Sequence, residues 1–441
     1  MHLTILTLLL LLLLPMPGVA RSQAGDESTF GLYVGGGERP VYAPIDPLTL
    51  ADLAQGESFA FDMSWPDIAI SADGSTSVLI DPGGGSLDAW ITVYDGLFGP
   101  VRLTIAVEEA VYGPRLSADG SRVSVTTSMM CGPSGCSERI MYTYDTATGV
   151  LVSQVAIPSM DPIWPELFDP SGKRLFVPFV DHFQSNPGPA TPAAGGWSLG
   201  PWPLQIAAYD LDTGQEAHRL TVPGVFAGSW QAGSIDGMYV GETQQPGIAL
   251  SPDGTRIAVV DTAMERLTLI DTATLTVVAT HDIHETESLA RRALRWLGIV
   301  PETAAAKVSQ GRSLEASFSP DGSALFLTGY ESTVDESVAV ATDPFEAVEV
   351  EGYGVARVDV GSGEIVATAL EGDDLDLVGT SPDGLWLYAF DIPARWWVDT
   401  QAPEIRLARL DATTLDVLAE RTFAERPQVM IVPYASSQLG A

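Results

Sequence analysis

The chain has 441 residues, with 57 acidic residues against 22 basic ones and a formal net charge of −35. So acidic a surface excludes nucleic acid and disfavours anionic membranes as partners, because such binding depends on Lys and Arg contacts to phosphates. The length exceeds the roughly 250–300 residues at which one hydrophobic core stops growing. The chain therefore holds either several domains or one repeating architecture, and internal repeats are sought first.

The N-terminus has the layout of a secretory signal peptide. A largely apolar run from Leu3 to Leu14 is followed by prolines and small residues, and it is shorter than the about 20 residues that a transmembrane helix needs. We expect cleavage after Ala20 or Ala24, and a soluble protein that is secreted or periplasmic, with no membrane insertion after cleavage. The predicted organisation is a signal peptide at 1–20, a flexible stub at 21–28 and a single domain at 29–441.

A four-residue turn recurs along the chain, with the consensus Ser-Pro/Ala-Asp-Gly. Proline presets φ at its second position and glycine accepts left-handed geometry at its fourth, as in a type I turn. Apolar residues alternate on both sides, so each copy predicts a β-hairpin. The six copies are Ser71–Gly74, Ser117–Gly120, Asp169–Gly172, Ser251–Gly254, Ser319–Gly322 and Ser381–Gly384.

A second signature is an apolar strand that ends in Asp, followed by two residues, usually including Thr, and then Gly or Leu. Together the two signatures describe four antiparallel strands per repeat with no helix between them, which is the blade of a β-propeller. The sequence therefore predicts an all-β, seven-bladed β-propeller of four-stranded antiparallel blades. The seven copies are at Asp46, Asp95, Asp145, Asp210, Asp271, Asp359 and Asp411.

The count of first turns is one short of the count of second signatures. The missing turn belongs to the blade that contains Asp46, whose strand beginning at Phe30 has no apolar strand before it. An apolar segment without a partner, Arg426–Tyr434, stands at the other end of the chain. We expect this C-terminal strand to complete the N-terminal blade, so that the ring closes without an exposed sheet edge.

The repeat "SPDGTRIAVVD…LTLIDTATLTVV", from Ser251 to Val278, resembles the repeats of bacterial YVTN-type and WD40-like (TolB-like) propellers. The resemblance covers nearly the whole mature chain. It implies the fold but not the activity, since such propellers include binding proteins, lactonase-like enzymes and heavy chains of amine dehydrogenases.

Nearly all extra residues fall on one predicted face, where the second strand of each blade leads to the third and where one blade leads to the next. Loops on a rigid scaffold are where binding usually resides. Tryptophans in these inserts could anchor a sugar ring or a protein partner, or could pack the inserts onto the blades. They are Trp197, Trp202, Trp230, Trp396 and Trp397.

Carboxylates gather on the same predicted face. Asp81, Asp181, Asp261 and Asp391 end the second strands of their blades, and one connection contains Glu371, Asp373, Asp374 and Asp376. These groups could hold a cation such as calcium, supply an acid–base pair, or simply be solvated turn residues. No other cofactor is predicted, and no metal site is assigned.

The segment 284–312 alone has helical periodicity, with Thr286 as a cap and Gly298 as a stop. It carries a basic island that could dock a partner, cover the central channel or pack on the rim. The basic residues are Arg291, Arg292, Arg295, Lys307 and Arg312.

The only two cysteines, Cys131 and Cys136, frame the turn-forming sequence CGPSGC. An even count in an exported chain predicts a local disulfide. Zinc binding would need further ligands that the sequence does not place nearby.

No catalytic constellation is recognisable: the chain has no G-x-S-x-G elbow, P-loop or C-x-x-C-H motif. We therefore expect a binding module for a protein, a peptide or a glycan, which uses the insert-rich face. The alternatives are a hydrolase or lyase-like enzyme with carboxylates around the central channel, and a structural component of the cell envelope.

Overall fold

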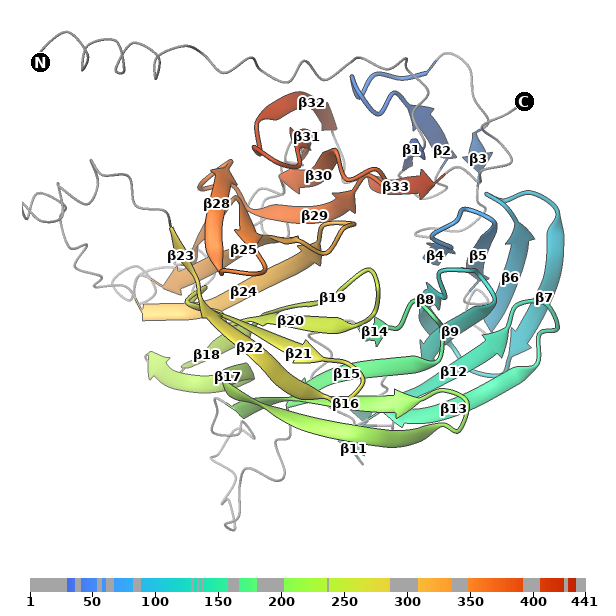
Figure 1. Cartoon of the computed structure of the whole chain (residues 1–441), viewed down its shortest axis with the longest axis horizontal. Coiled ribbons are helices and arrows are strands. Elements are labelled where there is room, and N and C mark those ends of the chain that lie inside the picture. The colour runs from blue at the N-terminus through green and yellow to red at the C-terminus, as the bar shows by residue number, and fades with distance from the viewer. Residues whose placement is uncertain are drawn as a thin grey trace, which may run out of the picture.

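A computed structural model gives the structure of this chain. It describes residues 30–35, 41–53, 58–60, 67–81, 89–127, 131–132, 135–136, 139–157, 166–180, 202–235, 238–285, 308–334, 348–391, 405–423 and 427–433. Every regular element in these residues is a β-strand. The strands form antiparallel blades that are arranged as a β-propeller around a common centre (Figure 1).

Five separate sheets have four antiparallel strands each. From the outer to the inner strand they are β3 (Phe59–Ala60), β2 (Val41–Ile45), β1 (Phe30–Gly35) and β33 (Gln428–Pro433); β7 (Val101–Val107), β6 (Ala89–Asp95), β5 (Thr76–Asp81) and β4 (Asp67–Ile70); β13 (Leu151–Ile157), β12 (Arg139–Asp145), β9 (Arg122–Thr127) and β8 (Val111–Leu116); β22 (Thr276–Asp282), β21 (Arg266–Asp271), β20 (Arg256–Val260) and β19 (Gly247–Leu250); and β32 (Val417–Phe423), β31 (Ile405–Asp411), β30 (Trp386–Asp391) and β29 (Leu375–Thr380).

The remaining large sheet has 11 strands and contains two further antiparallel runs of four. The first run is β14 (Leu167–Phe168), β15 (Arg174–Val180), β16 (Trp202–Asp210) and β17 (Gln215–Ile235); the second is β24 (Val308–Phe318), β25 (Ala324–Val334), β27 (Val355–Asp359) and β28 (Glu364–Ala369). β18 (Met238–Gln245) joins the runs, because it pairs with β17 and also, in parallel, with β24. β23 (His284–Glu285) pairs in parallel with β28, and β26 (Val348–Gly352) pairs with β25.

The ring closes as the sequence predicts. β33 pairs with β1 in antiparallel register from Phe30 opposite Pro433 to Gly35 opposite Gln428. Tyr42 of β2 adds a hydrogen bond from its hydroxyl to the side chain of Gln428. The C-terminal strand is therefore the inner strand of a sheet whose other three strands come from the N-terminal part of the chain.

The first turn is built by a Ser–Asp pair. Ser71 Oγ donates to Asp73 Oδ1 at 2.7 Å and accepts the backbone N–H of Thr76 at 3.0 Å. The same pattern appears around Ser251, which donates to Asp253 at 2.6 Å and accepts the N–H of Arg256 at 2.9 Å. Each such turn thus satisfies its own polar groups within six residues, which explains why the motif can be repeated.

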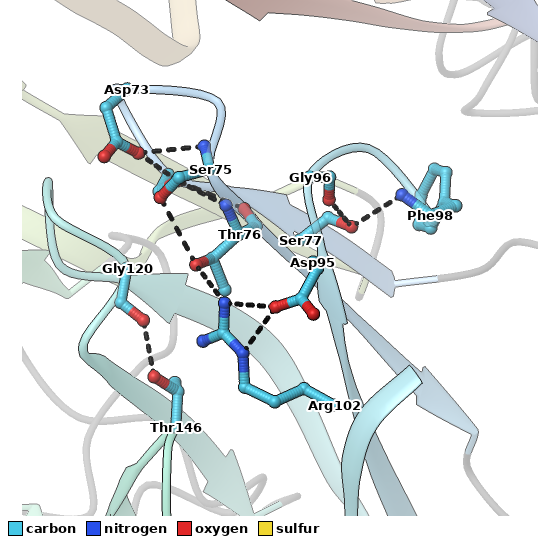
Figure 2. Close-up of polar contacts among 11 residues, drawn as sticks. Asp73, Ser75, Thr76, Ser77, Asp95, Gly96, Phe98, Arg102, Gly120 and Thr146 are labelled. Atoms are coloured by element: carbon cyan, nitrogen blue, oxygen red, sulfur yellow. Dashed lines mark hydrogen bonds and ion pairs between the residues drawn. The ribbon is translucent and has the colours of Figure 1, made fainter. Parts of the chain in front are cut away.

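The second turn is held by its aspartate. Asp271 Oδ1 accepts the backbone N–H and the hydroxyl of Thr274, each at 2.8 Å. In Figure 2 the equivalent Asp95 accepts Arg102 Nε at 2.7 Å, and Arg102 also reaches Thr76 Oγ1 at 3.4 Å. The two kinds of turn lie together on one face of the propeller.

The hydrophobic core lies between neighbouring sheets. Side chains of β16 such as Leu204 and Ile206 form one cluster with Ile257 and Val259 of β20, and all four are fully buried. Burial of side chains of this size stabilises the fold by about 1.5–3 kcal/mol each, measured from the extended chain. Alternation along each strand supplies apolar residues to both sides of a sheet, and this allows sheets to pack in a continuous ring.

Two features differ from the sequence expectation. Separate four-stranded sheets number five rather than seven, because the parallel pairing of β18 with β24 merges other strands into one sheet. No helix occurs among the described residues: the described parts of the predicted helical insert 284–312 are strands of β23 and β24, since their backbones pair with β28 and β25. Residues 286–307 lie outside the described residues, as do the predicted signal peptide and stub. In the described ranges no helix is long and apolar enough to cross a membrane.

Candidate functional site

A cavity of about 210 Å³ is lined by residues of the inner strands β19, β24 and β29 and by Gln245 of β18. This volume is well above the tens of Å³ that a single water molecule needs. Its walls combine apolar side chains with a carboxylate, an amide and a hydroxyl. The residues that matter for its chemistry are Gln245, Ile248, Leu314, Glu315, Leu377 and Val378.

A β-bulge in β29 shapes one wall. The register of β29 against β30 shifts between Leu377 and Gly379, so that one residue of β29 has no direct partner on β30. The backbone N–H of Leu377 donates instead to Glu315 Oε2 of β24, at 3.3 Å. Bulges re-aim side chains and interrupt pairing, and this one connects the two inner strands through the carboxylate of Glu315.

A polar surface runs across β18, β24 and β25 beside the cavity. Gln245 lies opposite Ser313, and Ser313 lies opposite Tyr330. Ser313 Oγ and Gln245 Oε1 are hydrogen-bonded at 3.2 Å. Residues that lie directly opposite on paired strands point to the same face, so these side chains share the face of Glu315, which is two residues beyond Ser313 on β24.

Tyr330 is half-buried on this surface. Burial raises the pKa of its phenol, and the negative charges of Asp374, Asp376 and Glu315 raise it further. The phenol is therefore neutral and able to donate a hydrogen bond at physiological pH. Of the three carboxylates that act on Tyr330, Glu315 belongs to β24, Asp376 belongs to β29, and Asp374 directly precedes β29.

Asp374 has the most perturbed carboxyl group of this region. Burial raises its pKa to about 6, and the charges of Asp376 and Asp391 act in the same direction. A carboxyl group that titrates near neutral pH is frequent at functional sites, although structural clusters also produce such shifts.

Arg406 of β31 organises the neighbouring carboxylates. Its guanidinium binds Asp391 at 2.8 Å and Glu420 at 2.9 Å, and it also contacts Asp373. Burial and the charge of Asp373 raise the pKa of Asp391, and Arg406 opposes this shift. The charge of Arg406 is thus shared among three acidic side chains, which leaves the cavity region acidic.

The structure corrects the placement of one predicted tryptophan. Trp202 does not lie in an irregular insert: it begins β16 and is 2 % exposed, packed in a core cluster with Leu204 and Val225. It therefore presents no surface to a ligand. Trp230 belongs to β17, but its side chain is not among the described residues; Trp197, Trp396 and Trp397 lie outside them entirely.

Of the predicted strand-end aspartates that the structure describes, Asp391 joins the carboxylate cluster. Asp261 is a turn residue, and its Oδ1 accepts the backbone N–H of Glu265 at 2.9 Å. Asp181 lies outside the described residues. For calcium or any other metal, the described residues contain no group of three or more His, Cys, Asp or Glu side chains that could hold an ion.

The cysteine hairpin is present in the backbone. β10 (Cys131–Gly132) and β11 (Gly135–Cys136) form a two-stranded sheet with Cys131 directly opposite Cys136. Cα atoms of opposite antiparallel residues are about 4.5–5.5 Å apart, within the range of a disulfide. The disulfide itself stays a prediction. From the predicted basic island, the structure describes Arg312, which forms an ion pair with Glu331 at 3.1 Å.

Sequence reasoning missed Glu315, Tyr330 and Arg406. Glu315 could have been noticed, because "SLEASF" places a charged residue inside a strand that otherwise reads as an inner strand. Tyr330 and Arg406 carry no local sequence signal. Tyr330 depends on Asp374 and Asp376, about 45 residues later in the chain, and Arg406 depends on Asp391, about 15 residues earlier.

Comparison with known proteins does not assign a family. No family model and no curated protein matches this chain. Solved structures with a similar overall arrangement include Kuenenia stuttgartiensis hydrazine synthase, with 17 % identity, 82 % of this chain and 80 % of that chain covered, and a TM-score of 0.41. A eukaryotic initiation factor has 12 % identity and a TM-score of 0.40, and the match covers 92 % of this chain and 99 % of that chain. A functionally unknown protein from Desulfotomaculum acetoxidans has 13 % identity and a TM-score of 0.45, and the match covers 92 % of this chain and 100 % of that chain.

Proposed function

We propose that this protein is an exported binding module that recognises a peptide, a protein or a glycan at the cavity between β19, β24 and β29. The observation that carries the proposal is the cavity of about 210 Å³, with polar groups of Gln245 and Glu315 beside apolar residues of three inner strands. Concave, largely apolar sites with a few convergent polar groups are the usual form of ligand sites.

We further propose that the ring is seven-bladed and of the YVTN or TolB-like type. The five separate sheets and the two antiparallel runs of four within the large sheet support this count. The recurrent Ser–Asp turns, found again at Ser319 and Ser381, support the repeat type. Export is supported by the N-terminal sequence alone.

The binding function is tested on the full mature chain with arrays of peptides and glycans. Val378→Trp should fill the cavity and reduce the amount of protein that the array ligands retain. The matched control is Val150→Trp, because Val150 is 61 % exposed at the turn before β13, outside the cavity lining. Equal signals from the two variants would refute the cavity as the recognition site.

A second candidate function is acid–base catalysis, a hydrolase or lyase-like reaction. One observation favours it: Asp374, near the negative charge of Asp376, has a pKa of about 6, and a carboxyl group that titrates near neutral pH can serve as a general acid or base. Turnover of chromogenic glycosides or lactones that disappears in Asp374→Asn would support this function over simple binding.

A further inference from the structure

The lining of the cavity is mostly apolar and contains one charged residue. Ile248, Leu314, Leu377 and Val378 supply hydrocarbon from three strands, whereas Glu315 is the charged residue of the lining. The side chain of Glu315 is held by the backbone N–H of Leu377, at 3.3 Å, at the bulge of β29. A ligand in this cavity therefore meets one positioned carboxylate next to a hydrocarbon surface.

The surroundings add negative charge to this carboxylate. Asp374, Asp376 and Glu315 all act on Tyr330, so these three carboxylates converge on one half-buried phenol. None of the residues that line the cavity is Lys or Arg. Arg406 forms ion pairs with Asp373, Asp391 and Glu420. An anionic ligand would be repelled here, and a cation would be attracted more strongly than in bulk water.

A buried hydroxyl lies next to Glu315, outside the lining of the cavity. Thr328 of β25 lies directly opposite Glu315 of β24 and is fully buried. Its Oγ1 has no hydrogen-bond partner among the described residues. Opposite residues share a face of the sheet, and buried polar atoms without partners are rare enough to call for an explanation. This hydroxyl is therefore an unpaired polar group beside Glu315 and not a contact for a ligand, and the cation-binding inference depends on the cavity and on its carboxylate.

We propose that the cavity binds an alkylammonium or alkylguanidinium group, with Glu315 pairing with the cation and the apolar residues of β19 and β29 packing against its alkyl stem. This inference rests on the proposed binding function and specifies its ligand class. Such a group could belong to a free small amine or to the Lys or Arg side chain of a peptide. Both share the same chemistry at the cavity and differ only in what extends beyond it.

The experiment is calorimetric titration of the mature chain with three probes: agmatine, the tripeptide acetyl-Gly-Arg-Gly-amide, and the same peptide with citrulline in place of arginine. Citrulline keeps the shape of the side chain but has no charge. We expect binding of at least one guanidinium probe, with weaker binding at higher salt, and no measurable binding of the citrulline peptide.

Two charge-matched variants complete the test. Glu315→Gln should weaken guanidinium binding by about fivefold or more, since it removes the charged partner of the cation at an exposed carboxylate. Glu265→Gln removes the same charge from the exposed loop between β20 and β21 and should leave the affinity within about twofold, because it changes only the long-range field. Tighter binding of agmatine would point to a free amine, and tighter binding of the arginine peptide would point to a protein side chain.

The outcomes separate this inference from the proposed function. Citrulline binding as tight as arginine binding, or unchanged affinity in Glu315→Gln, would overturn the cationic ligand class while leaving a cavity that binds other peptides. Absence of binding by both guanidinium probes would also overturn it, and a positive array signal that Val378→Trp reduces would then still support the binding function.

Discussion

Tyr388 of β30 donates a hydrogen bond of 3.0 Å from its hydroxyl to the carbonyl oxygen of Pro47, 341 residues earlier in the chain. Tyr388 is fully buried, and Phe30 packs against its ring edge-on at 6.3 Å. This contact joins the last sheet along the chain to the sheet that contains both termini. Closure of the ring thus depends on side chains as well as on the pairing of β1 with β33.

Removal of residues 428–441 should destabilise the protein severely. Loss of β33 exposes the backbone groups of β1 and uncovers Phe30 and Leu32, which are fully buried. Several hydrogen bonds at about 1 kcal/mol each, together with the lost apolar burial, approach the whole stability of a typical domain. The control is removal of residues 435–441, which keeps β33. Thermal unfolding followed by circular dichroism measures both, and equal midpoints would contradict circular closure.

Gly254→Ala should cost about 2–4 kcal/mol. Gly254 has a φ of +70°, and an added Cβ would lie 2.6 Å from Asp169 Oδ1 and 2.9 Å from Pro170 Cδ of the neighbouring turn. The left-handed backbone costs an L-residue about 1–2 kcal/mol, and the clash adds to that.

Gly96→Ala is the matched control for this change. Its φ is +66°, but a Cβ there meets no atom within 4 Å. It should show only the backbone cost. Urea denaturation of the two variants compares them, and equal losses would mean that the contact between neighbouring turns does not constrain Gly254.

The Ser–Asp turns should make the protein sensitive to strong acid. Hydrogen bonds from Ser319 and Ser323 lower the pKa of Asp321 to about 2, from 3.8 in the unfolded chain. Because the folded pKa is the lower one, this stabilisation is complete above pH 3.8 and is lost as the pH falls through about 2. Asp321→Asn should therefore be less stable than the wild type at pH 7, by about 1 kcal/mol after allowance for solvent screening. Urea titrations at pH 7 and pH 2 should show this difference only at pH 7, and a difference that persists at pH 2 would contradict the linkage.

Asp374→Asn should have the opposite effect. Burial raises the folded pKa of Asp374 to about 6, above 3.8, so its contribution to stability is complete below pH 3.8 and is lost as the pH rises through about 6. The asparagine variant should gain about 1 kcal/mol over the wild type at pH 8, the side chain being partly exposed, and nothing at pH 3.5. Thermal midpoints at both values measure this, and a variant less stable at pH 8 would show that the charged carboxylate stabilises the fold.

The cysteine hairpin allows a direct chemical test. If Cys131 and Cys136 form a disulfide, the unfolded protein should react with no thiol reagent until a reductant is added. The double variant Cys131→Ser/Cys136→Ser should lose about 2 kcal/mol, because closing a six-residue loop restricts the unfolded chain little. Two reactive thiols in the unfolded, non-reduced protein would exclude the bond.

The sequence predicted the blades well because their signals are local. Ser251, Asp253 and Arg256 satisfy one another within six residues, so turn chemistry and alternation identify strands without knowledge of the rest of the chain. Closure was predictable for a related reason, since the missing turn left one strand unpartnered at each end. Trp202 was assigned to an irregular insert although Trp202, Leu204 and Ile206 alternate as the buried residues of a strand do.

The candidate site was only partly predictable. Asp374 and Asp376 were visible as acidic residues of one connection, but their approach to Glu315, about 60 residues away in the chain, depends on packing between sheets. The parallel pairing of Gln245 with Ser313 depends on tertiary structure in the same way. Local pattern carries no information about such contacts.

That parallel pairing also limits how this chain can change over generations. β18 directly precedes the sheet β19–β22, and β23 directly follows it. β18 pairs with β24 and β23 pairs with β28, and both partners belong to the next antiparallel run of four strands. The sheet β19–β22 is therefore tied to the run β24–β28 both by the strand that precedes it and by the strand that follows it. Repeat proteins commonly gain or lose single modules by duplication and deletion, but here a chain without β19–β22 would have to connect β18 to β23 across the whole run from β24 to β28 to keep both pairings. Residues 238–369 should be inherited as one indivisible block.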